Sequence, residues 1–242
     1  DYGLSETYIG RFISHRRDEF YLTSKCGCTI VDKGDHDDFP HYFTRDNLLK
    51  NIDDSLRIMK TDYLDFWQPH TPSVDQLEEH NIVEVMQEVK EQGKVRHIGV
   101  SSVLPASHTF IAWGAFETFM IPYSGLERSE ENFISDAARA GAGTIIRGGV
   151  AQGEPGVGLG NEQVWDTWKR ANLDELRGEG ESRTAFLLRF TITHPDVHTT
   201  IVATTNPEQL TENLKTVEKG RLCEEVYEEA KVRLEEVGEV PE

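Results

Sequence analysis

Residues 45–70 read RDNLLKNIDDSLRIMKTDYLDFWQPH, and this stretch contains the pattern on which the whole fold is built. Residues 45–60 place four apolar side chains on one face of a helix: Leu48, Ile52, Leu56 and Met59. Thr44 stands in position to cap that helix. Residues 63–70 then form a short apolar run rich in aromatic side chains, which predicts a buried strand.

The same alternation runs along the rest of the chain. Five further apolar runs predict strands, at residues 19–27, 95–102, 118–125, 143–150 and 197–205. Amphipathic segments predict further helices, at residues 81–93, 129–141, 182–194, 206–220 and 224–238. Strands separated by helix-sized connections indicate an α/β protein with a parallel sheet, which is either doubly wound or a (β/α)8 barrel. Six strands are two short of a barrel, so a barrel would require residues upstream of Asp1.

Composition narrows the class of protein. The 242 residues carry a formal net charge of −18, which argues against nucleic acid or anionic lipid as a partner because phosphates are bound by Lys and Arg. No apolar run approaches the ~18 residues of a membrane-spanning helix. Cys26, Cys28 and Cys223 make an odd number without a framework spacing, which indicates a reducing, cytoplasmic setting. The oligomeric state is not encoded in any of these features.

Polar residues follow the predicted strands where parallel α/β folds place their functional groups. Lys25 lies in an apolar strand, His70 ends the next one, and Tyr2 stands just upstream of the first. A free tyrosine has a pKa of about 10, an adjacent ammonium favours its phenolate, and a histidine can orient a substrate oxygen. These three residue types suit carbonyl reduction, in which tyrosine protonates the oxygen while a cofactor supplies the hydride.

Six segments, in matching order, resemble the aldo-keto reductase family. They are DYGLSETYIG (1–10), YLTSKCG (21–27), SLRIMKTDYLDFWQPHTP (55–72), GKVRHIGVSS (93–102), IPYSGLER (121–128) and IVATTNPEQLTEN (201–213). The resemblance implies a (β/α)8 TIM barrel that lacks its first two strands here, with residues 1–242 as one domain. It also implies NADP(H) as the cofactor, with NAD(H) not excluded, and a small-molecule carbonyl or alcohol as the substrate.

The resemblance also implies roles for individual residues. Tyr2 would be the general acid, Lys25 would tune it and His70 would position the carbonyl. Ser101 would contact the nicotinamide amide together with Ser102, which stands where the family often has Asn. Two sets complete the expected cofactor contacts: Arg147 along the nicotinamide, and Thr205, Gln209, Glu212 and Asn213 at the adenosine phosphate and adenine.

Two departures from the family keep other functions open. The family's catalytic aspartate would precede residue 1, and Met120 stands where a glutamine usually reaches the nicotinamide, so a cofactor-binding regulatory barrel is the first alternative. A chain lacking the upstream residues is expected to have low stability and little activity. The second alternative is a metal-dependent hydrolase using His36, Asp37, Asp38 and His41. Neighbours in one polar loop rarely converge on a metal, so no metal site is predicted.

Two long connections, residues 28–43 and 150–180, are expected to set substrate specificity. The glycine-rich residues 153–162 are interpreted as a mobile loop instead of a dinucleotide fingerprint, because no helix opens at their last glycine. Trp165 and Trp168 either reach the substrate pocket from this connection or pack against the barrel.

Overall fold

The computed structural model describes residues 4–29, 31–34, 37–38 and 40–242, and the chain divides into two compact units, Asp1–Phe119 and Met120–Glu242. Each unit is described by itself. Tyr2 and His36 lie outside the described residues, and so does the side chain of Asp37. Among the residues described, no helix has both the length and the apolar character needed to cross a bilayer.

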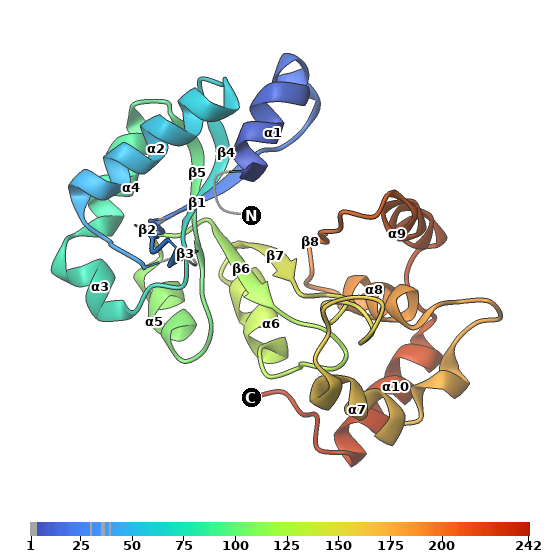
Figure 1. Ribbon diagram of the computed structural model, residues 1–242. Coiled ribbons are helices and arrows are strands. Elements are labelled where there is room, and N and C mark those ends of the chain that lie inside the picture. The colour runs from blue at the N-terminus through green and yellow to red at the C-terminus, as the bar shows by residue number, and fades with distance from the viewer. Residues whose placement is uncertain (1–3, 30, 35–36, 39) are drawn as a thin grey trace. The chain divides into compact units, whose positions relative to one another are not determined.

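The first unit contains the predicted alternation of helices and parallel strands (Figure 1). Its strands are β1 (Thr23–Cys26), β2 (Val31–Asp32), β3 (Asp37–Asp38), β4 (Leu64–Pro69) and β5 (Val95–Ser101). Its helices are α1 (Leu4–Phe12), α2 (Arg45–Met59), α3 (Val74–Glu79), α4 (Ile82–Glu91) and α5 (Ala106–Trp113), with a 3₁₀-helix at Ser14–Glu19. β1 pairs with β4 and β4 with β5, both in parallel, whereas β2 and β3 form a short antiparallel pair.

The second unit continues the same plan with longer connections (Figure 1). Its strands are β7 (Gly143–Arg147) and β8 (Thr199–Ile201), which pair in parallel. Its helices are α6 (Glu131–Arg139), α7 (Glu162–Arg170), α8 (Arg183–Thr193), α9 (Pro207–Lys219) and α10 (Glu224–Glu236), with a 3₁₀-helix at Leu173–Leu176. The remaining strand, β6 (Thr118–Pro122), begins in the first unit and ends in the second.

Strand order decides between the two architectures that the sequence left open. The order is β1-β4-β5-β6-β7-β8, so the main strands lie beside one another in the order in which the chain makes them. A doubly wound sheet would reverse its order at a switch point, and no reversal occurs among these six. The α/β class with sequential parallel strands, as in a (β/α)8 barrel, is therefore confirmed.

Local sequence signals explain why α2 and α4 form where they do. The Thr44 hydroxyl accepts a hydrogen bond from the Asn47 amide at 3.4 Å, which satisfies one of the free donors at the start of α2. The predicted apolar face of α2 is turned inward, with Leu48, Ile52 and Met59 at most 1% exposed. α2 contacts β1 and α4, and α4 contacts β5, so both helices cover the sheet of the first unit.

A buried carboxylate fixes the start of β4. Asp65 is 2% exposed and accepts hydrogen bonds from Arg17 (2.6 Å), Arg96 (2.8 Å) and the Leu22 amide (2.8 Å). Burial acts to raise its pKa, but these three donors outweigh burial and the pKa of Asp65 is lowered. The two guanidinium groups also lie 4.0 Å from the centre of the Tyr63 ring, so both cations stack on one aromatic side chain.

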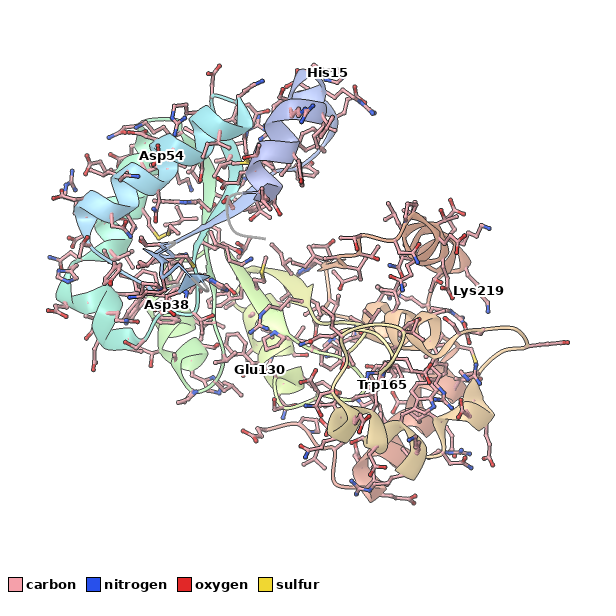
Figure 2. All side chains as sticks on the ribbon, viewed as in Figure 1. His15, Asp38, Asp54, Glu130, Trp165 and Lys219 are labelled. Carbon is pink, nitrogen blue, oxygen red and sulfur yellow. The ribbon has the colours of Figure 1, made fainter. Side chains whose placement is uncertain are left out.

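The long connection over residues 150–180 contains a helix that was not predicted from the sequence. Residues 162–170 form α7, and the Asn161 side chain caps it by accepting from the amides of Gln163 and Val164. Trp165, seen on this helix in Figure 2, is 3% exposed, and the Trp168 ring packs edge-on against Phe186. Of the two roles considered for these tryptophans, packing is the one observed, because an amphipathic helix turns both rings inward.

Candidate active site

Three of the predicted site residues come together at adjacent strand ends of the first unit. Lys25 on β1 is in register with Gln68 on β4. The His70 amide, just beyond β4, donates to the Cys26 carbonyl at 3.0 Å, and His70 forms a parallel bridge with Ser101 at the end of β5. Lys25, His70 and Ser101 therefore lie at the carboxyl edge of the sheet, where parallel folds collect functional groups.

Helix α1 begins two residues after Tyr2 in the sequence and is anchored to β1 and α2. The Glu6 carboxylate accepts hydrogen bonds from Ser24 of β1 at 2.6 Å and from Ser55 of α2 at 2.8 Å. Gly10 of the same helix lies so close to the Ile58 carbonyl that an added methyl group would collide with it. Glu6 lies in the first of the six family-like segments, but its anchoring role was not predictable because its partners are 18 and 49 residues away.

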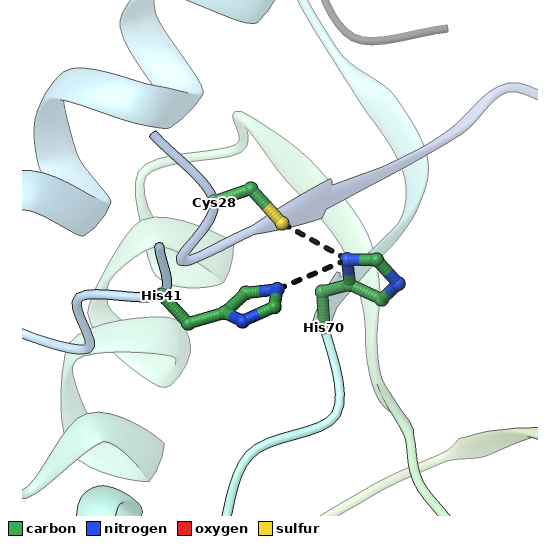
Figure 3. A group of neighbouring side chains, drawn as sticks. All are labelled: Cys28, His41 and His70. Carbon is green, nitrogen blue, oxygen red and sulfur yellow. Dashed lines mark hydrogen bonds between the residues drawn. The ribbon is translucent and has the colours of Figure 1, made fainter. Parts of the chain in front are cut away.

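The side chain of His70 has two neighbours that the sequence did not suggest. Its Nδ1 lies 2.9 Å from Cys28 Sγ and 3.4 Å from His41 Nε2, and the three side chains converge in Figure 3. All three are half-buried. His41, expected in a polar cluster with Asp38 and its neighbours, instead faces His70, while Asp38 forms an exposed ion pair with Lys33 at 3.7 Å.

Two serines follow β5 in different environments. Ser101 is fully buried, and its Oγ has no hydrogen-bond partner within the described part of the chain. Ser102 is also buried, but its hydroxyl shares a hydrogen bond of 2.8 Å with Ser107. Because a buried hydroxyl ordinarily has a partner, Ser101 fits the expected contact with an amide such as the nicotinamide carboxamide. Ser102 is already satisfied.

A buried amide adds a polar group that the strand-end pattern did not predict. Gln68 of β4 is fully buried; its Nε2 donates to Thr118 Oγ1 at 3.3 Å, and its Oε1 has no partner in the residues described. The bond passes over Gly99, where an added methyl group would collide with Thr118 Oγ1 and lie 3.1 Å from Gln68 Nε2. Glycine is thus required at position 99 for this contact to exist.

The predicted residues of the second unit begin with Arg147 at the end of β7. Arg147 is half-buried, and burial lowers its pKa against the opposing effects of Glu130 and Glu127. Its carbonyl accepts from the Tyr123 amide at 3.1 Å. Tyr123, another strand-end residue, is 1% exposed, and burial raises its pKa well above the usual value. Tyr123 is therefore a core residue. Met120, noted as a departure from the family, is also buried at 1% exposure.

The remaining cofactor candidates lie around the start of α9. Thr205 and Glu212 are exposed, whereas Gln209 and Asn213 are half-buried. Gln209 accepts a hydrogen bond of 2.5 Å from Thr204, and Asn206 caps the helix by accepting from the Glu208 amide at 2.9 Å. The first turn of a helix offers unpaired amides that suit a phosphate, although Glu208 adds negative charge to this turn of α9 and Glu212 to the next.

A sequential parallel sheet with polar residues at its carboxyl edge is the arrangement typical of α/β-barrel proteins. The chain belongs to the aldo/keto reductase family, whose sequence pattern matches residues 1–232. The family resemblance expected from the sequence is thereby confirmed, and the family consists of oxidoreductases.

Individual relatives agree with this assignment. The chain is 26% identical over 242 residues to YqkF of Bacillus subtilis (strain 168), an uncharacterized oxidoreductase, covering 93% of this chain and 77% of that protein. It is 32% identical over 157 residues to the aldo-keto reductase YhdN of the same organism, covering 63% and 46% respectively. Aldo-keto reductase AKR11C1 from Bacillus halodurans, in its holo form, shares the fold with a TM-score of 0.83 at 24% identity, over 96% of this chain and 78% of that one.

Proposed function

We propose that this protein is an NADP(H)-dependent oxidoreductase that reduces an aldehyde or ketone to an alcohol, or catalyses the reverse reaction. The main support is the neighbourhood of Lys25, His70 and Ser101 at three adjacent strand ends within one unit of a family member. In this proposal residues 1–242 act as one domain. The free cysteines described, Cys26, Cys28 and Cys223, suit a cytoplasmic location.

In this proposal Tyr2 donates the proton to the carbonyl oxygen and Lys25 assists it. An ammonium beside a phenol favours the phenolate and so eases release of the proton. In this proposal, that effect is the role of the half-buried Lys25 at the end of β1. The anchoring of α1 through Glu6 supports Tyr2, because it ties the helix that follows the tyrosine to β1.

His70 positions the carbonyl through its second ring nitrogen. Its Nδ1 faces the Cys28 sulfur at 2.9 Å. When the Cys28 thiol donates to Nδ1, a neutral His70 carries its proton on Nε2, which then serves as a hydrogen-bond donor to the substrate oxygen. Cys28 acts on this chemistry only by setting the tautomer, so it is a positioning residue.

The nicotinamide cofactor supplies the hydride when it is bound. Ser101, with its unpartnered hydroxyl, is proposed to hold the carboxamide, with Ser102 and Arg147 as further contacts. Thr205, Gln209, Glu212 and Asn213 are proposed to bind the adenosine half. Residues 203–213 contain no Lys or Arg that could bind a 2′-phosphate. The proposal of NADP(H) therefore rests on membership of the family, and NAD(H) is the competing cofactor.

The test follows NADPH and NADH oxidation against a panel of aldehydes and ketones, using protein expressed from its complete reading frame. Turnover that falls by at least about 100-fold in Tyr2→Phe, as expected for loss of a general acid, supports the proposal. Lys25→Met and His70→Gln should lower kcat/KM as well, while Cys223→Ser, which changes an exposed residue on the other unit, serves as the control. Tight cofactor binding without turnover would replace the proposal with the regulatory alternative.

A further inference from the structure

The cluster of Cys28, His41 and His70 is built from ligands that metal ions use in proteins (Figure 3). Each side chain offers one ligand atom, and the three atoms lie within 4.8 Å of one another. Within the described residues this is the one place where three or more such side chains meet. A thiolate and two imidazoles favour zinc or a similar borderline-soft cation over magnesium or calcium.

We propose that Cys28, His41 and His70 form a binding site for a divalent transition metal, with Zn²⁺ as the best match. Tetrahedral zinc with bonds of about 2.3 Å to sulfur and about 2.0–2.1 Å to nitrogen places its ligand atoms roughly 3.3–3.6 Å apart. His41 Nε2 and His70 Nδ1 are already 3.4 Å apart. Cys28 Sγ and His70 Nδ1, at 2.9 Å, would separate by about 0.6 Å as the thiol loses its proton.

Two of the ligands are held ready by the backbone around them. Cys28 and His41 face each other in an antiparallel bridge, flanked by hydrogen bonds from Thr29 to Pro40 (3.0 Å) and from Tyr42 to Gly27 (2.7 Å). The His41 ring also stacks on Phe43, with 6.1 Å between ring centres. These backbone hydrogen bonds hold Cys28 beside His41, and His70, which follows β4, lies next to both.

Neighbouring cysteines do not compete for the ion. Cys26 is fully buried, and its thiol is not among the ligand atoms that converge with those of His41 and His70. Cys223 lies on the second unit and is exposed. Three protein ligands leave the fourth position of a tetrahedral ion open, which is the arrangement of zinc sites that exchange a water or another small ligand.

Metal binding has a consequence that rests on the proposed function. A cation held by His70 Nδ1 brings positive charge and new steric bulk to the side chain that positions the substrate. Nε2 of His70 keeps its proton when Nδ1 binds the metal, so we expect Zn²⁺ to change kcat/KM for carbonyl reduction reversibly, with recovery after addition of a chelator. The site would thus make the enzyme responsive to available zinc.

Metal binding is measured in an assay that needs no turnover. A protein that fails to bind metal can therefore be distinguished from one that lacks the proposed reductase activity. Reduced, metal-free protein from the complete reading frame is titrated with Co²⁺, whose thiolate complexes show an intense charge-transfer absorption. One ion per chain is expected, with the charge-transfer band absent in Cys28→Ser. His41→Gln should weaken binding by about 100-fold or more, since losing a group that only orients a ligand already costs about 10- to 100-fold. The control variants, Cys223→Ser and His108→Gln, should bind as the parent does.

A second readout needs no substitution in the cluster. The parent protein is alkylated with iodoacetamide with and without Zn²⁺, and the modified cysteines are located by peptide mass mapping. Zinc is expected to protect Cys28 and leave Cys223 as reactive as before. Alkylation of Cys28 that zinc does not slow, or a charge-transfer band that survives Cys28→Ser, would overturn the metal site. Zinc binding without any reductase activity would retain the site and refute the proposed function.

Discussion

The carboxylate of Glu6 accepts a hydrogen bond of 2.6 Å from the Ser24 hydroxyl and so joins α1 to β1. A second bond, from Ser55 at 2.8 Å, adds α2 to the same carboxylate. Three elements that are distant in the chain thus depend on one acceptor. Since Tyr2 precedes α1, the orientation of that helix has consequences for the proposed chemistry as well as for stability.

Glu6→Ala is expected to lower the free energy of unfolding by about 2 kcal/mol, because two hydrogen bonds to a charged acceptor are lost. Glu6→Gln, which keeps one acceptor oxygen, should cost less than Glu6→Ala. Urea denaturation followed by circular dichroism measures both. Glu19→Ala is the control, because its partner Arg16 is exposed and such pairs contribute little. Equal stability of Glu6→Ala and Glu19→Ala would contradict the anchoring role.

Gly99→Ala is expected to destabilise the protein by about 1–3 kcal/mol, the usual cost of overfilling a core. The added methyl group would meet the Thr118 hydroxyl and would lie 2.7 Å from the Thr118 carbonyl oxygen. Thr118→Ala removes the first obstacle and leaves the second, so the double variant should recover part of the loss. A double-mutant cycle in urea measures the coupling, and strictly additive effects would show that this contact does not decide the cost.

Arg128→Met is expected to cost about 3–5 kcal/mol in unfolding free energy. The guanidinium is fully buried and donates to Glu131 at 2.6 Å and to the carbonyl of Glu239 at 3.2 Å. Removing it leaves the buried Glu131 with Lys231 as its remaining cation, at 3.0 Å. The control is Arg139→Met, which breaks an exposed ion pair with Asp136 and should change stability by about 0.5 kcal/mol or less. Similar losses in both variants would refute this account.

The stability of the parent is expected to decline below about pH 6.5, in part through His194. Burial lowers the pKa of His194, and its Nδ1 accepts from the Asp196 amide at 3.2 Å, which requires the neutral ring. Below about pH 6.5, His194 therefore binds a proton in the unfolded chain more readily than in the folded chain. The neutral His194 ring stabilises the folded state fully above about pH 6.5. This stabilisation is lost as the pH falls towards the lowered pKa of His194, and it does not change further below that pKa.

His194→Gln isolates this contribution, because glutamine keeps an acceptor and does not titrate. Urea denaturation at pH 7.5 and at pH 5.5 should show a smaller loss of stability for the variant than for the parent. The slope attributable to one histidine is at most about 1.4 kcal/mol per pH unit. Parallel losses in the two proteins would assign the acid sensitivity to other groups.

The sequence predicts this fold well where the signals are local. The cap at Thr44 and the apolar face of α2 both involve residues a few positions apart, and both are observed. The six strands are found at their predicted places, although each is shorter than its apolar run. α7 was missed because the preceding glycines dominate the composition, even though Asn161 and the spacing of Trp165 and Trp168 signal a capped amphipathic helix.

Several contacts in the candidate site could not be predicted from local sequence signals, because the residues that form them are distant in the chain. His70 meets Cys28 and His41 across 42 and 29 positions, and no local periodicity connects them. The hydrogen bond between Gln68 and Thr118 spans 50 positions. The strand-end placement of Lys25, His70 and Ser101 was predictable because parallel strands bring their carboxyl ends to one edge. Their roles, and that of Tyr2, stay predictions.

The stack of Arg17, Tyr63 and Arg96 around Asp65 links substitutions that would otherwise be independent during evolution. One carboxylate neutralises two cations that lie 4.0 Å from the centre of the same ring, so its loss would leave two like charges side by side. A lineage that replaces Asp65 must therefore also release at least one of the arginines. We expect these positions to change together among descendants of this sequence, as one inherited unit spread over three separate segments of the chain.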